Sequence, residues 1–155
     1  KALGDAATRQ SIIKRFADHG IGEHRLELLA WIAGASPLTA YHGVDIGLDT
    51  YPYHGTTTTM EALWMGVPVV TLAGGWHASR VGVSIMARCK LDELIAANPD
   101  DYVKIATNMA ANLPLLRELR HQLRGLLVRG GMTDGIGFTR ELETAYQQAW
   151  NELFP

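Results

Sequence analysis

The chain has 155 residues, of which 47% are hydrophobic and 19% charged, with a formal net charge of -2. This composition favours one ordinary domain with a packed core and argues against intrinsic disorder. The basic residues are scattered, which argues against a nucleic-acid-binding or anionic-membrane surface. No apolar run approaches the length of a membrane helix. The single cysteine, Cys89, is interpreted as a small buried hydrophobic residue, and a reducing compartment fits it.

The first two thirds of the chain alternate between helical and extended patterns. In chain order, the apolar spacing and the Gly and Pro positions predict a helix over 5–19, a buried strand over 26–33, a helix over 36–43, a strand over 44–48, a helix over 56–65, a strand over 67–72 and a helix over 78–88. This order predicts an α/β fold, a Rossmann-like parallel sheet with flanking helices. Ligands of such sheets bind beyond the carboxyl ends of the strands.

The last third of the chain reads as helices only. Helices are expected over 100–112 and onward to 129, and a final helix carries an apolar stripe. The stripe consists of Phe138, Leu142, Tyr146, Trp150 and Leu153. We interpret it as core packing, with docking on a neighbouring domain as the alternative. The expected organisation is a core over 1–97, lacking its first strand and helix, and a helical extension over 98–155, within a single domain.

One helix start has an unusual composition. Residues 55–59 read Gly-Thr-Thr-Thr-Thr, although threonine has low helix propensity. The first amides of a helix lack internal partners and lie at the positive end of its dipole, so this start is suited to a phosphate or diphosphate. Glu61, one turn further, is placed to accept hydrogen bonds from a ribose. The alternative is that Thr56 is only an N-cap and Glu61 only a first-turn acid.

Several segments together resemble a known family. Asp45–Thr50, Gly55–Thr59 and Glu61–Thr71 closely resemble the C-terminal catalytic region of O-GlcNAc transferases, plant Spindly proteins and bacterial tetratricopeptide-repeat relatives. Residues 73–84 resemble the family's next loop and helix, and weaker similarity extends over essentially the whole chain. The resemblance implies the C-terminal, donor-binding half of a GT-B glycosyltransferase, in which two Rossmann-like domains face each other across a cleft.

The resemblance also implies roles for residues of the unusual helix start. It assigns Gly55, Thr56, Thr57 and Thr58 to the donor diphosphate and Glu61 to the ribose. Animal enzymes carry His at the position of Thr56, whereas Spindly-like relatives carry Thr. This departure leaves the donor open between UDP-GlcNAc and GDP-fucose.

Four further residues are candidates for the vicinity of the base or the diphosphate. Tyr41 and His42 lie in the short helix where relatives place a base-stacking His, and a solvent-facing position is an equal alternative for His42. His77 and Arg80 follow a strand, where a cation could help a departing diphosphate. A structural cap or salt bridge is an equal alternative for these two residues.

Other polar and aromatic residues are given no ligand role. Tyr51, Tyr53 and Trp64 are interpreted as packing residues rather than sugar platforms. The histidines show no metal-ligand spacing, and no metal site is expected.

The function that the resemblance implies is inverting transfer of GlcNAc from UDP-GlcNAc to Ser or Thr hydroxyls of a protein acceptor, without cofactor or obligatory metal. GDP-fucose-dependent O-fucosyl transfer is the alternative. A non-catalytic nucleotide-binding or interaction module and a sugar-nucleotide epimerase are alternatives from other classes. A catalytic lysine, the N-terminal GT-B domain and the tetratricopeptide repeats lie upstream in relatives. We therefore expect a piece of a cytoplasmic, bacterial enzyme that binds nucleotide without turnover.

Overall fold

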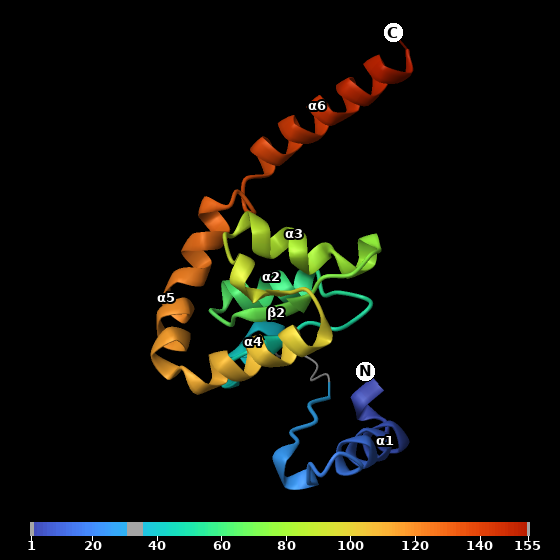
Figure 1. Cartoon of the computed structure of the whole chain (residues 1–155), viewed down its shortest axis with the longest axis vertical. Coiled ribbons are helices and arrows are strands. Elements are labelled where there is room, and N and C mark those ends of the chain that lie inside the picture. The colour runs from blue at the N-terminus through green and yellow to red at the C-terminus, as the bar shows by residue number, and fades with distance from the viewer. Residues whose placement is uncertain (1, 31–35, 155) are drawn as a thin grey trace. The chain divides into compact units, whose positions relative to one another are not determined.

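The computed structural model describes residues 2–30 and 36–154, which are drawn in colour in Figure 1. They divide after Ser36 into two compact units, of which the second begins at Pro37. The expected boundary at 97/98 lies inside the second of these units, in which helix α4 (Pro99–Ala111) contacts strands of the sheet.

The first unit contains helix α1 (Ala6–Ala17) between the short 3-10 helices η1 (Ala2–Gly4) and η2 (Glu23–Arg25). The carboxylate of Asp5 caps α1 by accepting a hydrogen bond of 2.7 Å from the Thr8 amide. Gly20 follows the helix with a φ of +77°. The helix predicted over 5–19 is therefore present.

The strand predicted over 26–33 is wrong for the described part of that range. Residues 26–30 are irregular, and 31–33 lie outside the described residues. A strand needs a neighbouring strand to satisfy its backbone groups, and the described strands pair within the second unit. The carbonyl of Leu28 instead accepts a hydrogen bond of 2.7 Å from the guanidinium of Arg9.

The second unit is built around a three-stranded parallel sheet of order β1-β2-β3. The strands are β1 (Gly47–Leu48), β2 (Val69–Leu72) and β3 (Ile95–Ala96), with Gly47 opposite Val69 and Thr71 opposite Ile95. The predicted parallel α/β sheet is confirmed. The strand expected over 44–48 is shorter than predicted, and β3 was not predicted.

Helices surround this sheet, as Figure 1 shows for α3 and α4 on either side of β2. In chain order they are the 3-10 helix η3 (Pro37–Gly43), α2 (Thr57–Trp64), the 3-10 helix η4 (His77–Ser79), α3 (Val81–Arg88), the 3-10 helix η5 (Asp92–Leu94), α4 (Pro99–Ala111), α5 (Leu113–Arg129) and α6 (Gly135–Leu153). The helices predicted in the last third are present. The side chain of Asn98 caps α4 by accepting a hydrogen bond of 2.9 Å from the Asp101 amide.

The core lies where α2, α3 and α5 pack together around β2. Leu63, Val70 and Met86 are fully buried, and Leu123 of α5 is buried with them. Cys89 belongs to the same cluster, and burial raises the pKa of its thiol. The interpretation of this cysteine as a buried hydrophobic residue is confirmed.

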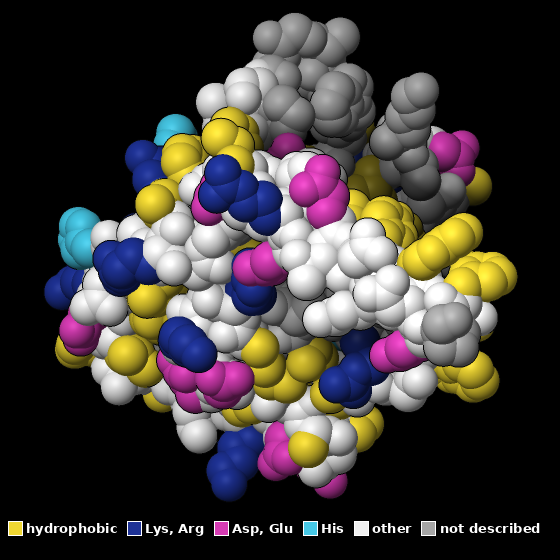
Figure 2. Space-filling model, turned by 90° about the horizontal axis from the view of Figure 1, so that it is seen from above, with side chains coloured by type: hydrophobic (Ala, Val, Ile, Leu, Met, Phe, Trp, Pro, Cys, Tyr) yellow, Lys and Arg dark blue, Asp and Glu magenta, His cyan; other side chains and the backbone are white. Residues whose placement is uncertain are grey.

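The face that Figure 2 shows carries acidic, basic and hydrophobic side chains side by side. Among the described residues, no helix combines the length and apolar character that crossing a lipid bilayer requires.

The apolar stripe of α6 is not packed into the core, so that interpretation is wrong. No residue of α6 is buried, and the five side chains of the stripe are between 39% and 74% exposed. The spacing does produce an amphipathic helix. Periodicity identifies an apolar face, but it does not identify which element covers that face.

Polar substitution on this stripe is therefore expected to leave the stability of the chain unchanged. Trp150→Gln should shift the free energy of unfolding by less than about 0.5 kcal/mol, because Trp150 is exposed and Gln is a good helix former. Leu127→Ala, at a position 1% exposed, is the matched control and should cost about 2–5 kcal/mol. Urea denaturation followed by circular dichroism measures both. A loss above about 1 kcal/mol for Trp150→Gln would show that the stripe is packed.

Candidate functional site

The candidate site lies at the carboxyl edge of the sheet, where the β1–α2 connection brings the start of α2 beside the ends of β1 and β2. Helix α2 begins at Thr57, and the side chain of its N-cap residue Thr56 makes no capping hydrogen bond. Among the described residues, the first amide of this helix to reach a backbone carbonyl is that of Met60, at 3.0 Å from the Thr56 oxygen. The amides before it are available as donors at the positive end of the helix dipole.

The threonines of this helix start divide into exposed and buried positions. Thr56, Thr57 and Thr58 are exposed, whereas Thr59 is buried. We call residues 56–58 the α2 tip. A cavity of about 180 Å³ opens beside the tip. Its lining includes Tyr41, Gly47, Asp49, Gly55, Thr58 and Thr59.

Gly55 comes immediately before the tip, and its backbone amide is already engaged. It donates a hydrogen bond of 2.8 Å to Oδ1 of Asp49. A Cβ atom at position 55 would lie 2.6 Å from the hydroxyl oxygens of both Thr58 and Thr59. The glycine is therefore required by the close approach of two threonine side chains, a reason that the sequence did not reveal.

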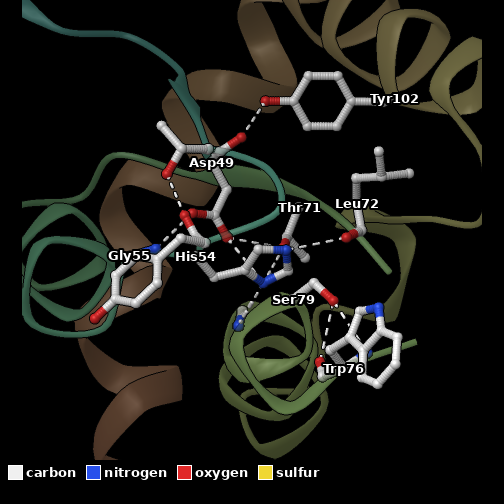
Figure 3. Close-up of polar contacts among 11 residues, drawn as sticks. Asp49, His54, Gly55, Thr71, Leu72, Trp76, Ser79 and Tyr102 are labelled. Carbon is white, nitrogen blue, oxygen red and sulfur yellow. Dashed lines mark hydrogen bonds and ion pairs between the residues drawn. The ribbon is translucent and has the colours of Figure 1, made fainter. Parts of the chain in front are cut away.

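Asp49 is the centre of a buried polar network that is drawn in Figure 3. Its side chain is 2% exposed. Besides the Gly55 amide, the carboxylate accepts a hydrogen bond of 2.8 Å from the Thr71 hydroxyl through Oδ2. The backbone carbonyl of Asp49 accepts a third hydrogen bond, of 2.8 Å, from the Tyr102 hydroxyl. Burial, and then the neighbouring Asp49 charge, raises the pKa of Tyr102.

His54 completes the network and is 1% exposed. Its Nδ1 accepts a hydrogen bond of 3.1 Å from the Gly82 amide, and its Nε2 lies 3.0 Å from the Leu72 carbonyl, which can only accept. These partners fix the neutral tautomer with the proton on Nε2. The separation of 3.4 Å between Nδ1 and Oδ2 of Asp49 is therefore not a salt bridge between charged groups.

Tyr41, in η3, lines the same cavity and lies against Glu61 and the tip. Its hydroxyl donates a hydrogen bond of 3.1 Å to the Thr58 carbonyl. Burial raises the pKa of Tyr41, and the charge of Glu61 raises it further. The structure thus brings Tyr41, Glu61 and the tip together.

The other sequence candidates lie at exposed positions. His42 is exposed at the end of η3, and His77 is exposed at the start of η4. Arg80 is also exposed, and its guanidinium donates a hydrogen bond of 3.1 Å to the Gly74 carbonyl. Arg80 therefore braces the loop after β2 in the described structure.

The packing role expected for three aromatic residues is wrong for the tyrosines. Tyr51 is 54% exposed and Tyr53 75% exposed, because both lie in the β1–α2 connection on the outside of the network. Trp64 is 38% exposed and packs its ring under the guanidinium of Arg124, at 4.8 Å from ring centroid to Cζ.

Sequence reasoning missed the buried polar network of Asp49, His54 and Thr71. The sequence places Asp49 only at the carboxyl edge of a strand, within the motif Asp45–Thr50, and His54 only among the histidines without metal-ligand spacing. The hydrogen bonds that join Asp49 and His54 to Thr71 and Gly82 span 17 to 28 residues of the chain, so no local pattern pairs these residues. The available signal was the position of Asp49 directly after β1 and of Thr71 one residue before the end of β2, because the side chains of parallel strands converge at this edge. Among the described residues, no three His, Cys, Asp or Glu side chains gather as a metal-binding group.

Fold and site together define an α/β domain of the Rossmann-like class, with a polar helix tip at the carboxyl edge of its sheet. The model of glycosyl transferase family 41 matches residues 5–140. The chain belongs to glycosyltransferase family 41.

Individual relatives agree with this assignment. The chain is 45% identical over 143 residues to SPINDLY of Oryza sativa subsp. japonica, described as a probable UDP-N-acetylglucosamine–peptide N-acetylglucosaminyltransferase, covering 92% of this chain and 15% of that protein. It is 32% identical over 108 residues to SEC of Arabidopsis thaliana, which carries the same description, covering 69% of this chain and 11% of that protein.

A solved structure supports the fold. A mutant of Thermobaculum terrenum O-GlcNAc transferase is similar with a TM-score of 0.88 and 39% identity, over 97% of this chain and 29% of that one. The prediction of a C-terminal GT-B half is confirmed by this similarity. The chain spans about 15% of the length of its SPINDLY relatives.

Proposed function

We propose that the chain is the donor-binding part of an inverting protein O-glycosyltransferase that transfers GlcNAc from UDP-GlcNAc to Ser or Thr hydroxyls. The observation that carries this proposal is the α2 tip: three exposed threonines at the start of a helix, on the ligand edge of the sheet, with no capping hydrogen bond from the Thr56 side chain. Membership of family 41 supports the reaction class.

The chemistry of transfer explains why such a tip is useful. As the bond between the sugar and the diphosphate breaks, negative charge grows on the leaving diphosphate. Fixed donors aimed at that charge stabilise the transition state more than the ground state, and one such donor is worth about 3 kcal/mol in a closed site. Thr56, Thr57 and Thr58 would supply those donors, from a helix that needs no reorganisation.

The position of Glu61 supports a ribose contact. Its carboxylate lies one turn after the tip and beside Tyr41, whose hydroxyl is fixed on the Thr58 carbonyl. A carboxylate at this place can accept hydrogen bonds from the two ribose hydroxyls once the diphosphate occupies the tip. Tyr41 and His42 are proposed to lie toward the base, and His77 and Arg80 toward the diphosphate.

One observation favours GDP-fucose as a second candidate donor. Thr56 has the Spindly-like identity at a position where animal O-GlcNAc transferases carry His. The proposed acceptor is a protein hydroxyl with either donor, and no metal or cofactor is proposed.

The proposal includes partners beyond this chain. An N-terminal GT-B domain would close the cleft and supply the catalytic lysine, and tetratricopeptide repeats would recruit the acceptor. We propose a cytoplasmic enzyme and expect this chain by itself to bind nucleotide weakly without turnover. Calorimetric titration with UDP, GDP and their sugars tests this, and robust glycosyl transfer by the chain alone would contradict it.

A variant of Glu61 separates the ribose contact from the diphosphate contact. Glu61→Ala is expected to weaken binding of the preferred nucleoside diphosphate about tenfold and to leave inorganic pyrophosphate binding unchanged, because pyrophosphate has no ribose. Glu93→Ala, at an exposed acid of η5, is the control for net charge. If the affinities for both ligands fall equally, or if neither affinity falls, Glu61 does not contact the ribose.

A further inference from the structure

The carboxylate of Asp49 is buried without a basic partner. Among the described ion pairs, no Lys or Arg side chain lies within 4.0 Å of it, and His54 is held neutral by its own hydrogen bonds. Burying a carboxylate is costly unless donors satisfy it. Its donors are the Gly55 amide and the Thr71 hydroxyl. The first of these belongs to the turn that leads into the α2 tip.

Asp49 therefore acts as an internal anion at the positive end of α2. It holds the amide of Gly55, which would otherwise be the first donor offered to a ligand approaching the helix. Its other oxygen accepts a hydrogen bond from the hydroxyl of Thr71 in β2. The turn before α2 is thus tied to the sheet through one carboxylate, and the free donors begin at Thr56.

The surroundings leave this carboxylate little freedom. A Cβ atom on Gly82 would lie 2.5 Å from Oδ2 of Asp49 and 3.0 Å from Nδ1 of His54. The Gly82 amide meanwhile fixes the imidazole. Figure 3 shows the carboxylate, the imidazole and the Thr71 hydroxyl converging on one point. In such a packed network, removing one member displaces the others.

We infer that Asp49 is a positioning residue for diphosphate binding at the α2 tip. Its carboxylate occupies the Gly55 amide, so that the amides of Thr56, Thr57 and Thr58 are the ones presented to the leaving diphosphate. The inference rests on the proposed function. On this inference Gly55 shapes the tip and keeps its amide on Asp49, which differs from the diphosphate contact that the resemblance implies.

Nuclear magnetic resonance of the whole chain, titrated with UDP and separately with GDP, tests the first half of the inference. The amide resonances of Thr57 and Thr58 are expected to shift strongly with the nucleotide that binds. The Gly55 amide is expected to stay nearly unchanged and to exchange slowly with solvent already in the free protein. A large ligand-induced shift of the Gly55 amide, or its rapid exchange in the free protein, would overturn the inference.

Variants of Asp49 test the second half. Asp49→Ala is expected to weaken binding of UDP or GDP, whichever binds the unmodified chain, about tenfold. It is also expected to expose the Gly55 amide to exchange with solvent. Asp49→Asn keeps an oxygen for the Gly55 amide and a donor toward Thr71, and removes a negative charge near the diphosphate. It should bind within about threefold of the unmodified chain, or more tightly. Asp45→Asn, at an exposed acid four residues earlier, is the control for charge.

Thr71→Val provides a second test in case Asp49→Ala does not fold. It replaces only the hydroxyl, by a methyl group, and should weaken nucleotide binding less than Asp49→Ala does. If the folded Asp49→Ala chain binds as well as the unmodified chain, or if Asp49→Asn binds as weakly as Asp49→Ala, the positioning role is wrong and the proposed function stands. If the unmodified chain binds neither nucleotide, both the proposed function and the inference that rests on it are wrong.

Discussion

Replacing Thr57 by Asp is expected to abolish nucleotide binding while leaving the fold at least as stable as before. Thr57 is the exposed first residue of α2. An acid in the first turn of a helix favours the helix, by about 0.3–1 kcal/mol. The same carboxylate would lie against the proposed diphosphate. Two unit charges about 4 Å apart repel each other by about 4 kcal/mol near a protein surface.

This repulsion corresponds to a loss of about three orders of magnitude in affinity. Calorimetric titration with the preferred nucleotide measures the loss, and urea denaturation measures the stability. Thr57→Asn is the matched control, because Asn has nearly the shape of Asp without its charge, and it should bind within about tenfold of the unmodified chain. If the Asp and Asn variants bind equally well, the diphosphate does not lie at the tip.

The opposite signs of the two effects make this substitution informative. A change that harms the fold usually harms binding as well, so their joint loss says little about a site. Here the helix dipole favours the introduced charge in the free protein, whereas the ligand disfavours it. The carboxylate of Asp49 already lies at the same helix end, and it is satisfied there by the Gly55 amide and the Thr71 hydroxyl.

The parts of the fold that the sequence could predict depend on local physics. The start of α2 at residues 56–57 follows from the threonine run and the preceding glycine, and its end follows from Gly66. Strand β2 is a compact run of branched residues, and Asn98 before Pro99 is a standard helix start. In each of these cases the signal and the structure that it determines lie within a few residues.

The parts that failed depend on what a segment meets in space. The apolar run over 26–33 has the composition of a strand, yet its described residues have no strand beside them. The stripe of α6 has the periodicity of a packed helix, yet it is exposed. Composition and period describe one side of a contact, and the partner is determined by the rest of the fold.

The candidate site shows the same division. The tip and Glu61 could be predicted because a helix start and its first turn are local. The roles of Asp49 and His54 could not, because their partners Thr71 and Gly82 come from other elements. The tautomer of the histidine is determined entirely by one amide and one carbonyl that are distant in sequence.

Gly66 connects α2 to β2, and Gly66→Ala is expected to destabilise the chain by about 2–5 kcal/mol. Its φ of +81° would cost an L-residue about 1–2 kcal/mol. An added Cβ would also lie 2.8 Å from the backbone oxygen of Arg120 in α5, and relieving such overpacking costs about 1–3 kcal/mol. The helix backbone cannot rotate away as a flexible side chain could. Urea denaturation followed by circular dichroism measures the loss.

Two other glycines separate these contributions. Gly131 has a φ of +73°, and a Cβ there would make only an ordinary contact of 3.5 Å with the end of the Arg88 side chain, so Gly131→Ala should cost about 1–2 kcal/mol. Gly75 has no atom within 4 Å of its added Cβ, and Gly75→Ala should change stability by less than about 0.5 kcal/mol. The expected order is therefore Gly66, Gly131, Gly75.

The difference between the free energies of unfolding lost in Gly66→Ala and in Gly131→Ala measures how tightly α5 packs on the turn between α2 and β2. This packing matters for the site, because the same short helix carries the tip at its other end, only eight residues away. We therefore expect Gly66→Ala to weaken nucleotide binding as well, in the fraction of protein that stays folded. Equal losses of stability for Gly66→Ala and Gly131→Ala would mean that α5 moves aside at this contact. The position of the tip would then depend on the Asp49 network alone.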